Sequence, residues 1–297
     1  MVPGSLTASV AAEASRDAHD DGTGKWGVEG SCQLGTCSYN GVPIAGGSTR
    51  FAIGPESYTF TDGKLEFDYT DYILRKRYGG PQRANMQVDR IQHHRENHTT
   101  DIANLRGSAW PGPLLRLVDS KGADLVDEMF GFHQPPLIST SGRADHSKPG
   151  TGTLLTSTVK GQGIIDYEFL DRTLQLTSAS ASIKTTPHRQ EVKELVFGTF
   201  GGTAGGEVTV TPGESTRIEA GLRWDDLNLS EIGRKFAFEK AAQGKITGRI
   251  DFTTLAGRTD TLNGKGVIGL RNGQLFHVPI FGLLSLPLGT VLSKEFS

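Results

Sequence analysis

The chain has 297 residues, and its 31 lysines and arginines nearly balance its 33 aspartates and glutamates. This balance argues against a broad basic surface, so we expect no nucleic-acid partner. The 39 glycines have no G-X-Y period, which excludes collagen and is typical of many short strands joined by tight turns.

The N-terminal region combines a polar segment with the chain's two cysteines. Residues 1–25 are rich in Ala, Ser and Asp and lack the basic and apolar regions of a signal peptide, so we predict a flexible leader. Two cysteines exclude a four-cysteine zinc site. Cys32 and Cys37 meet only if the chain turns between them, so the sequence leaves a disulfide open.

Two dipeptides predict β-hairpins near opposite ends of the chain. Asp62-Gly63 lies between alternating runs within 59–69, and Asn272-Gly273 lies between similar runs within 267–276. Both dipeptides suit two-residue turns, in which both central residues need positive φ. The polar region 75–106 gives no clear pattern. Strands are expected between the hairpins at 154–159, 164–169, 174–176, 180–184, 206–211, 217–224, 245–253 and 264–270.

Helices are expected to be few and short. We predict two small ones at 113–118 and 123–130, and a third at 230–242 with Ser230 as its N-cap and Gly244 after its end. In several predicted strands apolar residues occupy alternate positions, which indicates an antiparallel sheet with one apolar and one polar face. Such a face fits a closed sandwich core as well as an open groove.

The C-terminal third carries a recurring order of motifs. Trp224–Ile232 leads into a short helix, and the strand Gly244–Phe252 follows. Leu262–Gly266, Leu270–Pro279 and Ile280–Leu286 complete the order. This order resembles the C-terminal region of the AsmA-like, TamB-related proteins of bacterial envelopes. The resemblance is good over 205–292, fair over 110–204 and only compatible before that.

The resemblance implies a mainly β fold, in which an extended, twisted antiparallel sheet curls into a hydrophobic groove. Segments 26–204 and 205–297 would then be parts of one continuous sheet. Phospholipid acyl chains are the implied ligand, and phospholipid transport or outer-membrane assembly in the periplasm is the implied role. The implied groove residues are Val208, Val210, Ile218, Leu222, Ile246, Ile250, Phe252, Ile268, Leu270 and Phe276.

Two features of the chain depart from this family. Family members have an N-terminal anchor in the inner membrane and further strands, whereas this sequence ends at Phe296-Ser297. We therefore expect a fragment of a longer protein, whose flanking segments would contact inner-membrane or envelope proteins. The longest apolar stretch, 278–292, is too short to span a bilayer and contains two prolines. It is expected either to fold over the end of the sheet or to touch a membrane or a neighbouring module.

Several motifs suggest chemistry, but simpler interpretations are favoured. His94 and His98 would share a face only on a helix, and the HExxH motif is absent, so we expect surface histidines and no metal. The glycine-rich run 198–206 lacks a following Lys-Ser/Thr and reads as a turn between strands. Asp225-Asp226 would point to opposite faces of a strand. We expect no catalytic residue, no cofactor and no enzyme.

The alternative function is a secreted or surface β-rich module for adhesion or carbohydrate binding. Such a module would present exposed aromatic side chains, for which Trp110, Tyr69 and Tyr72 are the candidates. A lipid-sized apolar groove would favour the first function, and an aromatic platform on the rim of a closed core would favour this one.

Overall fold

A computed structural model describes residues 27–39, 41–70, 83–116, 120–147, 152–169, 172–237, 243–256 and 258–273. Within these residues, 16 strands form an antiparallel sheet that is not closed into a barrel, and three short helices accompany it. The predicted fold class, mainly β with an antiparallel sheet and few helices, is therefore confirmed. The predicted leader 1–25 and the apolar stretch 278–292 lie outside the described residues.

The chain divides into two compact units. The first contains the described residues up to Glu128, together with Phe132–Gln162 and Lys184–Pro187. The second contains Met129–Gly131, Gly163–Ile183 and the described residues from His188 onward. Each unit has its own set of paired strands, and we describe them separately.

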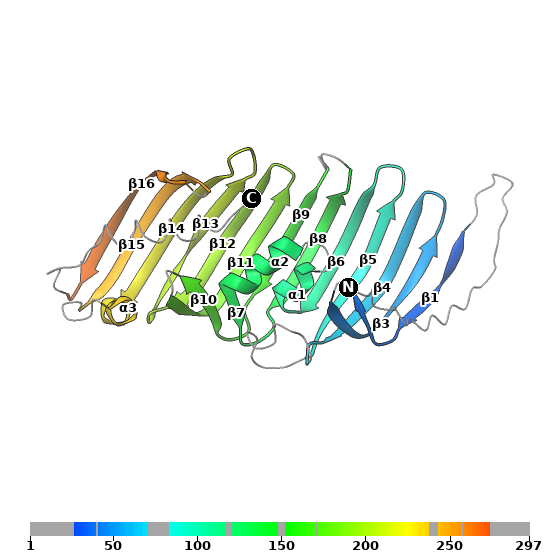
Figure 1. Cartoon of the computed structure of the whole chain (residues 1–297), viewed down its shortest axis with the longest axis horizontal. Helices are drawn as coiled ribbons and strands as arrows, with labels where there is room; N and C mark the ends of the chain where they lie inside the picture. Colours follow the sequence, from blue (N-terminus) through cyan, green and yellow to red (C-terminus); the bar gives the residue numbers. More distant parts are fainter. Residues whose placement is uncertain are drawn as a thin grey trace. The chain divides into compact units, whose positions relative to one another are not determined.

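The strands of the first unit follow one another in space almost in chain order, β1-β3-β4-β5-β6-β8-β9, with β2 also paired to β3 (Figure 1). The region 75–106, where no clear pattern was expected, contains β5 and most of β6. The bounds of all these strands are β1 Val28–Leu34, β2 Cys37–Tyr39, β3 Val42–Ile53, β4 Ser57–Asp68, β5 Arg83–His94, β6 Thr99–Ser108, β8 Leu137–Asp145 and β9 Leu154–Lys160.

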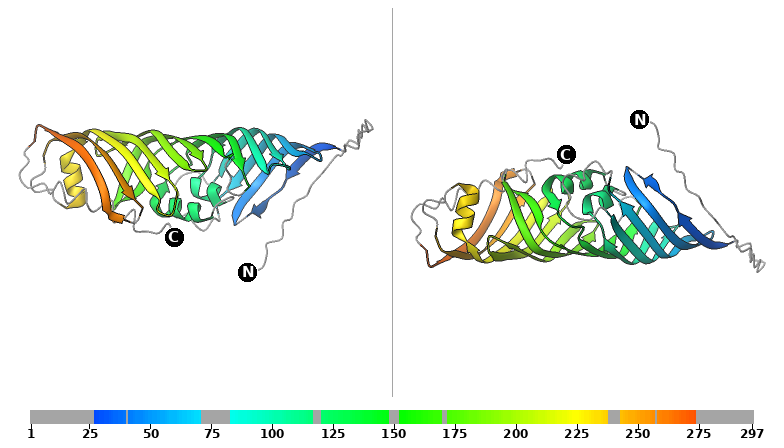
Figure 2. Two further views of the ribbon diagram at one scale, coloured as in Figure 1. Left: turned by 90° about the horizontal axis from the view of Figure 1, so that it is seen from above. Right: turned by 90° about the horizontal axis from the view of Figure 1, so that it is seen from below.

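Two short helices and a cluster of buried aromatic residues accompany these strands. Helices α1 (Pro111–Arg116) and α2 (Ser120–Met129) lie on one side of its strands (Figure 2). Phe67, Tyr69 and Trp110 are each only 1% exposed. The Tyr69 ring stacks on Phe67 at 5.6 Å and meets Trp110 edge-on at 4.8 Å between centroids. Aromatic burial of this kind contributes much of a core's hydrophobic stabilisation.

The predicted hairpin turn at Asp62-Gly63 is wrong, because β4 runs straight through these residues. Only Asp62 has a positive φ, 52°, whereas the expected turn needs two such residues. The pairing with β3 advances from Ser48–Lys64 to Arg50–Thr61, so β4 carries one extra residue and forms a β-bulge. The Asp-Gly signal therefore marks a local positive φ rather than a reversal of the chain.

The extra residue is shared by three neighbouring strands. Asp62 on β4 lies level with Asp89 on β5, which in turn lies level with Asn104 on β6, whose φ is 55°. The pairing of β6 with β8 then loses the extra residue between Ile102 and Leu105. We call this row of Asp62, Asp89 and Asn104 the bulge line. Because a bulge displaces side-chain alternation by one position, apolar residues on both sides of the bulge line can share one face.

The second unit contains the strands β11-β12-β13-β14-β15-β16, with β10 paired to β11 and β7 to β10 (Figure 1). The strands predicted at 174–176 and 180–184 are one strand, β11, in which Ser178 has a positive φ of 51°. Bounds are β7 Phe130–Phe132, β10 Ile165–Phe169, β11 Arg172–Thr186, β12 Arg189–Thr199, β13 Gly202–Thr211, β14 Arg217–Asn228, β15 Lys245–Leu255 and β16 Arg258–Arg271.

The turn expected in the glycine-rich run 198–206 is confirmed. Thr199 pairs with Gly202, and the two residues between them, Phe200 and Gly201, both have positive φ, 47° and 68°. This is the geometry of a two-residue hairpin. The Asn272-Gly273 hairpin stays a prediction, because its second strand falls outside the described residues.

The third helix begins earlier than predicted. Helix α3 covers Leu229–Phe236, and its N-cap is Asn228, not Ser230. The Asn228 side-chain oxygen accepts hydrogen bonds from the backbone N–H groups of Ser230 and Glu231 at 2.9 and 3.3 Å. Asparagine and serine cap helices about equally well, so the choice between them is made by where β14 ends.

Candidate apolar ligand sites

The predicted groove residues of the second unit share one face of β13 to β16. Val208 pairs with Ala220, which pairs with Phe252, and the neighbouring row joins Leu222 to Ile250. Residues paired across antiparallel strands, and residues two apart on a strand, point to the same side. The register therefore brings together nine of the ten predicted residues, which we call the apolar face: Val208, Val210, Ile218, Leu222, Ile246, Ile250, Phe252, Ile268 and Leu270. Phe276 lies outside the described residues.

The apolar face is only partly buried. None of its nine residues is fully buried, and Ile268 is 39% exposed. Glycines alternate with large side chains along its strands. Gly264 lies opposite Phe252, where an added Cβ would come within 2.7 Å of the Phe252 Cβ. The face thus presents a continuous apolar surface that keeps part of its area in water, a property typical of binding surfaces.

The first unit holds an apolar pocket that the sequence did not predict. Its volume is about 270 Å³, and strands β1, β3, β4, β5 and β6 contribute to it. Phe60 and Ile91 lie on one side of the bulge line, whereas Met86 and Val88 lie on the other. The full apolar lining is Cys32, Leu34, Phe60, Leu65, Met86, Val88, Ile91 and Leu105.

The bulge line explains how this pocket forms. Along β5, Asp89 and Arg90 are both exposed in succession, which breaks the alternation that buries Met86 and Val88. On the polar side, the Asp89 carboxylate accepts hydrogen bonds from Asn104 Nδ2 at 2.7 Å and from Arg106 Nη1 at 2.8 Å. These bonds hold the pKa of Asp89 below its ordinary value. The polar side chains at the bulge line are thus paired with one another away from the pocket.

One sequence signal could have indicated the pocket. Ala84, Met86 and Val88 alternate with polar residues, the pattern of a half-buried strand. The contribution of Phe60 and Ile91 was not visible, because it depends on the register of three strands.

The histidine cluster does not form a metal site. His93 and His94 are neighbours on β5 and therefore point to opposite faces, so the helical arrangement considered for His94 and His98 is wrong. The His94 Nε2 atom lies 3.0 Å from Asp101 Oδ2, and Arg143 binds the same carboxylate. In the described part of the chain no group of three or more His, Cys, Asp or Glu side chains is arranged to hold a metal ion.

The aromatic platform expected for the alternative function does not exist at two of its three positions. Trp110 and Tyr69 are core residues, and a buried ring cannot contact a carbohydrate at the surface. Tyr72 lies outside the described residues. The two cysteines are free: Cys32 on β1 lies opposite Thr49, and Cys37 on β2 lies opposite Ile44.

The predicted alternation at Asp225-Asp226 is interrupted by a bulge. Asp226 has a φ of 54°, and the pairing with β15 shifts between Trp224 and Leu227. The Asp226 carboxylate lies 3.6 Å from both Lys245 Nζ and Arg271 Nη1. This carboxylate therefore belongs to a cluster of surface charges.

None of the helices in the described ranges has the length and apolar character needed to cross a membrane. Comparison with known proteins adds no relative: no family model matches the chain, and neither a curated protein nor a solved structure matches it.

Proposed function

We propose that this protein binds the acyl chains of lipids on its one-sided apolar surfaces. The observation that carries the proposal is the apolar face of β13 to β16, whose large side chains align by register and keep part of their area exposed. A lipid chain of ~16 methylenes, at about 0.8 kcal/mol for each buried methylene, gives a large driving force without any dedicated polar group.

The pocket of the first unit supports the same chemistry independently. Eight of its lining residues are apolar or, like Cys32, weakly polar, and its volume of about 270 Å³ suits a segment of a chain rather than a whole lipid. Following the resemblance to AsmA-like proteins, we extend the proposal to a non-enzymatic role in phospholipid transport or outer-membrane assembly in the cell envelope.

The test is mass spectrometry of lipids bound to protein purified without detergent and then incubated with phospholipid vesicles. The variants are Ile250→Glu on the apolar face and Phe60→Glu in the pocket, where Phe60 is already 37% exposed. A buried carboxylate repels an acyl chain because the charge must lose its water. We expect each variant to lose bound lipid while its circular dichroism spectrum stays that of the wild type.

The matched control is Leu154→Glu. Leu154 on β9 is 48% exposed and belongs neither to the apolar face nor to the lining of the pocket. It receives the same charge without entering the apolar face, so bound lipid should be unchanged. A wild-type protein that takes up no phospholipid, or a control that loses as much lipid as Ile250→Glu, contradicts the proposal.

A further inference from the structure

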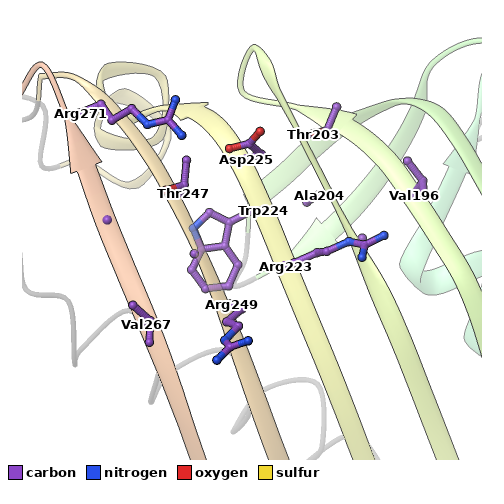
Figure 3. A pocket seen from close by; sticks show the side chains of 13 residues that line it. Val196, Thr203, Ala204, Arg223, Trp224, Asp225, Thr247, Arg249, Val267 and Arg271 are labelled. Carbon is purple, nitrogen blue, oxygen red and sulfur yellow. The ribbon is translucent and has the colours of Figure 1, made fainter.

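The face opposite the apolar one carries an unusual pair of arginines. Arg223 on β14 lies directly opposite Arg249 on β15. Like charges directly opposite on neighbouring strands are destabilising, since their Cβ atoms are only about 5 Å apart. In Figure 3 the two side chains leave adjacent strands and their guanidinium groups point apart, as expected for two cations without a shared counter-ion.

Neither arginine has a carboxylate partner among the described residues, although other arginines in these strands do. Arg217, also on β14, lies 2.9 Å from Glu219, and Arg258 on β16 lies 2.7 Å from Asp260. The pair Arg223–Arg249 therefore departs from the pattern of its own sheet. Its cost to folding is unexplained by any contact within the described chain.

A surface hollow of about 690 Å³ surrounds the pair. Arg271 also lines it, and the only acidic lining residue is Asp225 (Figure 3). Arg271 lies 3.6 Å from the Asp226 carboxylate, so the positive charge in the lining that has no carboxylate partner comes from Arg223 and Arg249. Thr203 and Thr247 add hydroxyl groups to the lining. The hollow thus combines two arginines that have no carboxylate partner among the described residues with additional hydrogen-bond donors.

We propose that this hollow, the arginine site, binds a phosphate group through Arg223 and Arg249, with Arg271 at its edge. The planar guanidinium group matches the geometry of phosphate oxygens and binds them in pairs. Both side chains are exposed, so they can turn from the orientation in Figure 3 toward a shared anion, which converts their repulsion into two attractions. The site is separate from the acyl-chain surfaces and stands even if the protein binds no lipid.

The probe is sodium phosphate, compared with sodium chloride at equal ionic strength, and the readouts are the melting temperature and the dissociation constant from calorimetry. The variants are Arg223→Gln and Arg249→Gln, and the matched control is Arg217→Gln, whose side chain on the same strand already has a carboxylate partner. Phosphate also stabilises proteins in general, because it is excluded from their surfaces. The control Arg217→Gln should show this general stabilisation to the same extent as the wild type.

Two opposite effects are expected from Arg249→Gln. Without phosphate at low salt, the variant should melt at a higher temperature than the wild type, because the like-charge contact is gone. With phosphate, the dissociation constant should rise about tenfold, the loss expected for one charged hydrogen-bonding partner. Arg217→Gln should keep the wild-type dissociation constant. Equal phosphate effects on the wild type, Arg249→Gln and Arg217→Gln overturn the proposal.

The source of the phosphate is resolved by sedimentation with vesicles of phosphatidylglycerol and phosphatidylcholine. Binding that requires Arg223 and Arg249 identifies a lipid headgroup as a ligand. Absence of vesicle binding, together with calorimetric binding of free phosphate, assigns the arginine site to a soluble phosphate compound. Absence of both overturns the proposal.

Discussion

The two units use apolar residues in different ways. In the first, Phe67, Tyr69 and Trp110 are almost completely buried and pack against one another. In the second, the apolar face of β13 to β16 has side chains of similar size that all keep some contact with water. The aromatic cluster can therefore hold the fold, whereas the apolar face leaves area that a ligand can still bury.

The largest expected effect tests the buried side of this comparison. Trp110→Ala should lower the free energy of unfolding by about 3–5 kcal/mol, because it leaves a cavity beside the Tyr69 ring. Urea denaturation followed by circular dichroism measures this loss. Val196→Ala, at a position 41% exposed on β12, serves as the control and should change stability little. Equal losses for the two variants would mean that the aromatic cluster is not the main core.

The next effect concerns the backbone beneath the apolar face. Gly206 has a φ of 150°, and an added Cβ would lie 2.0 Å from the carbonyl oxygen of Gly221. Gly206→Ala should therefore cost about 1–3 kcal/mol through backbone strain and displacement of β14. Gly213→Ala, whose Cβ would meet its nearest atom at 3.6 Å, is the comparison in the same urea experiment. If Gly206→Ala is half unfolded at the same urea concentration as the wild type, these strands move apart easily enough to accept the added Cβ.

A smaller effect is expected on the apolar face itself. Phe252→Ala removes a partly exposed ring, so the cost should be roughly 1–2 kcal/mol, well below that of Trp110→Ala. The same variant should bind clearly less phospholipid than the wild type although it remains folded. If Phe252→Ala destabilises the protein as much as Trp110→Ala does, the apolar face is a sealed core and the contrast between the units disappears.

The smallest effect concerns the polar side of the first unit. The hydrogen bonds of Arg143, and then of His94, lower the pKa of Asp101. A lowered pKa in the folded state adds stability above the pKa of the unfolded chain, about 4, and that stability is lost as the pH falls through the folded pKa. In Asp101→Asn the free energy of unfolding should therefore fall less steeply as the pH drops from about 5 to about 2. Arg143→Gln should reproduce most of this change, and an unaltered pH profile in both variants would contradict it.

Sequence reasoning succeeded where alternation continues without interruption. Val208, Ile250 and Leu222 lie on one face because each strand keeps its period of two through these positions. It failed where an extra residue enters a strand. Asp62-Gly63 is a turn signal by its local chemistry, and only the pairing with β3 shows that it is a bulge.

The same limit explains the missed pocket. Phe60 and Met86 line one cavity only because the alternation changes between them, and register is a property of neighbouring strands rather than of a segment. The arginine site was missed for a related reason. Arg223 and Arg249 are 26 positions apart, and nothing local to either of them reveals that they are opposite each other.

The bulge line also constrains how this sequence can change through evolution. Asp62, Asp89 and Asn104 occupy one level of three adjacent strands. Deleting one of them alone would reverse the orientation of every side chain beyond it in that strand and leave its neighbours unchanged. Single-residue insertions and deletions at this level should therefore be inherited in sets of three, so a family alignment would show them as correlated gaps about 27 and 15 positions apart, distances that follow from the numbering.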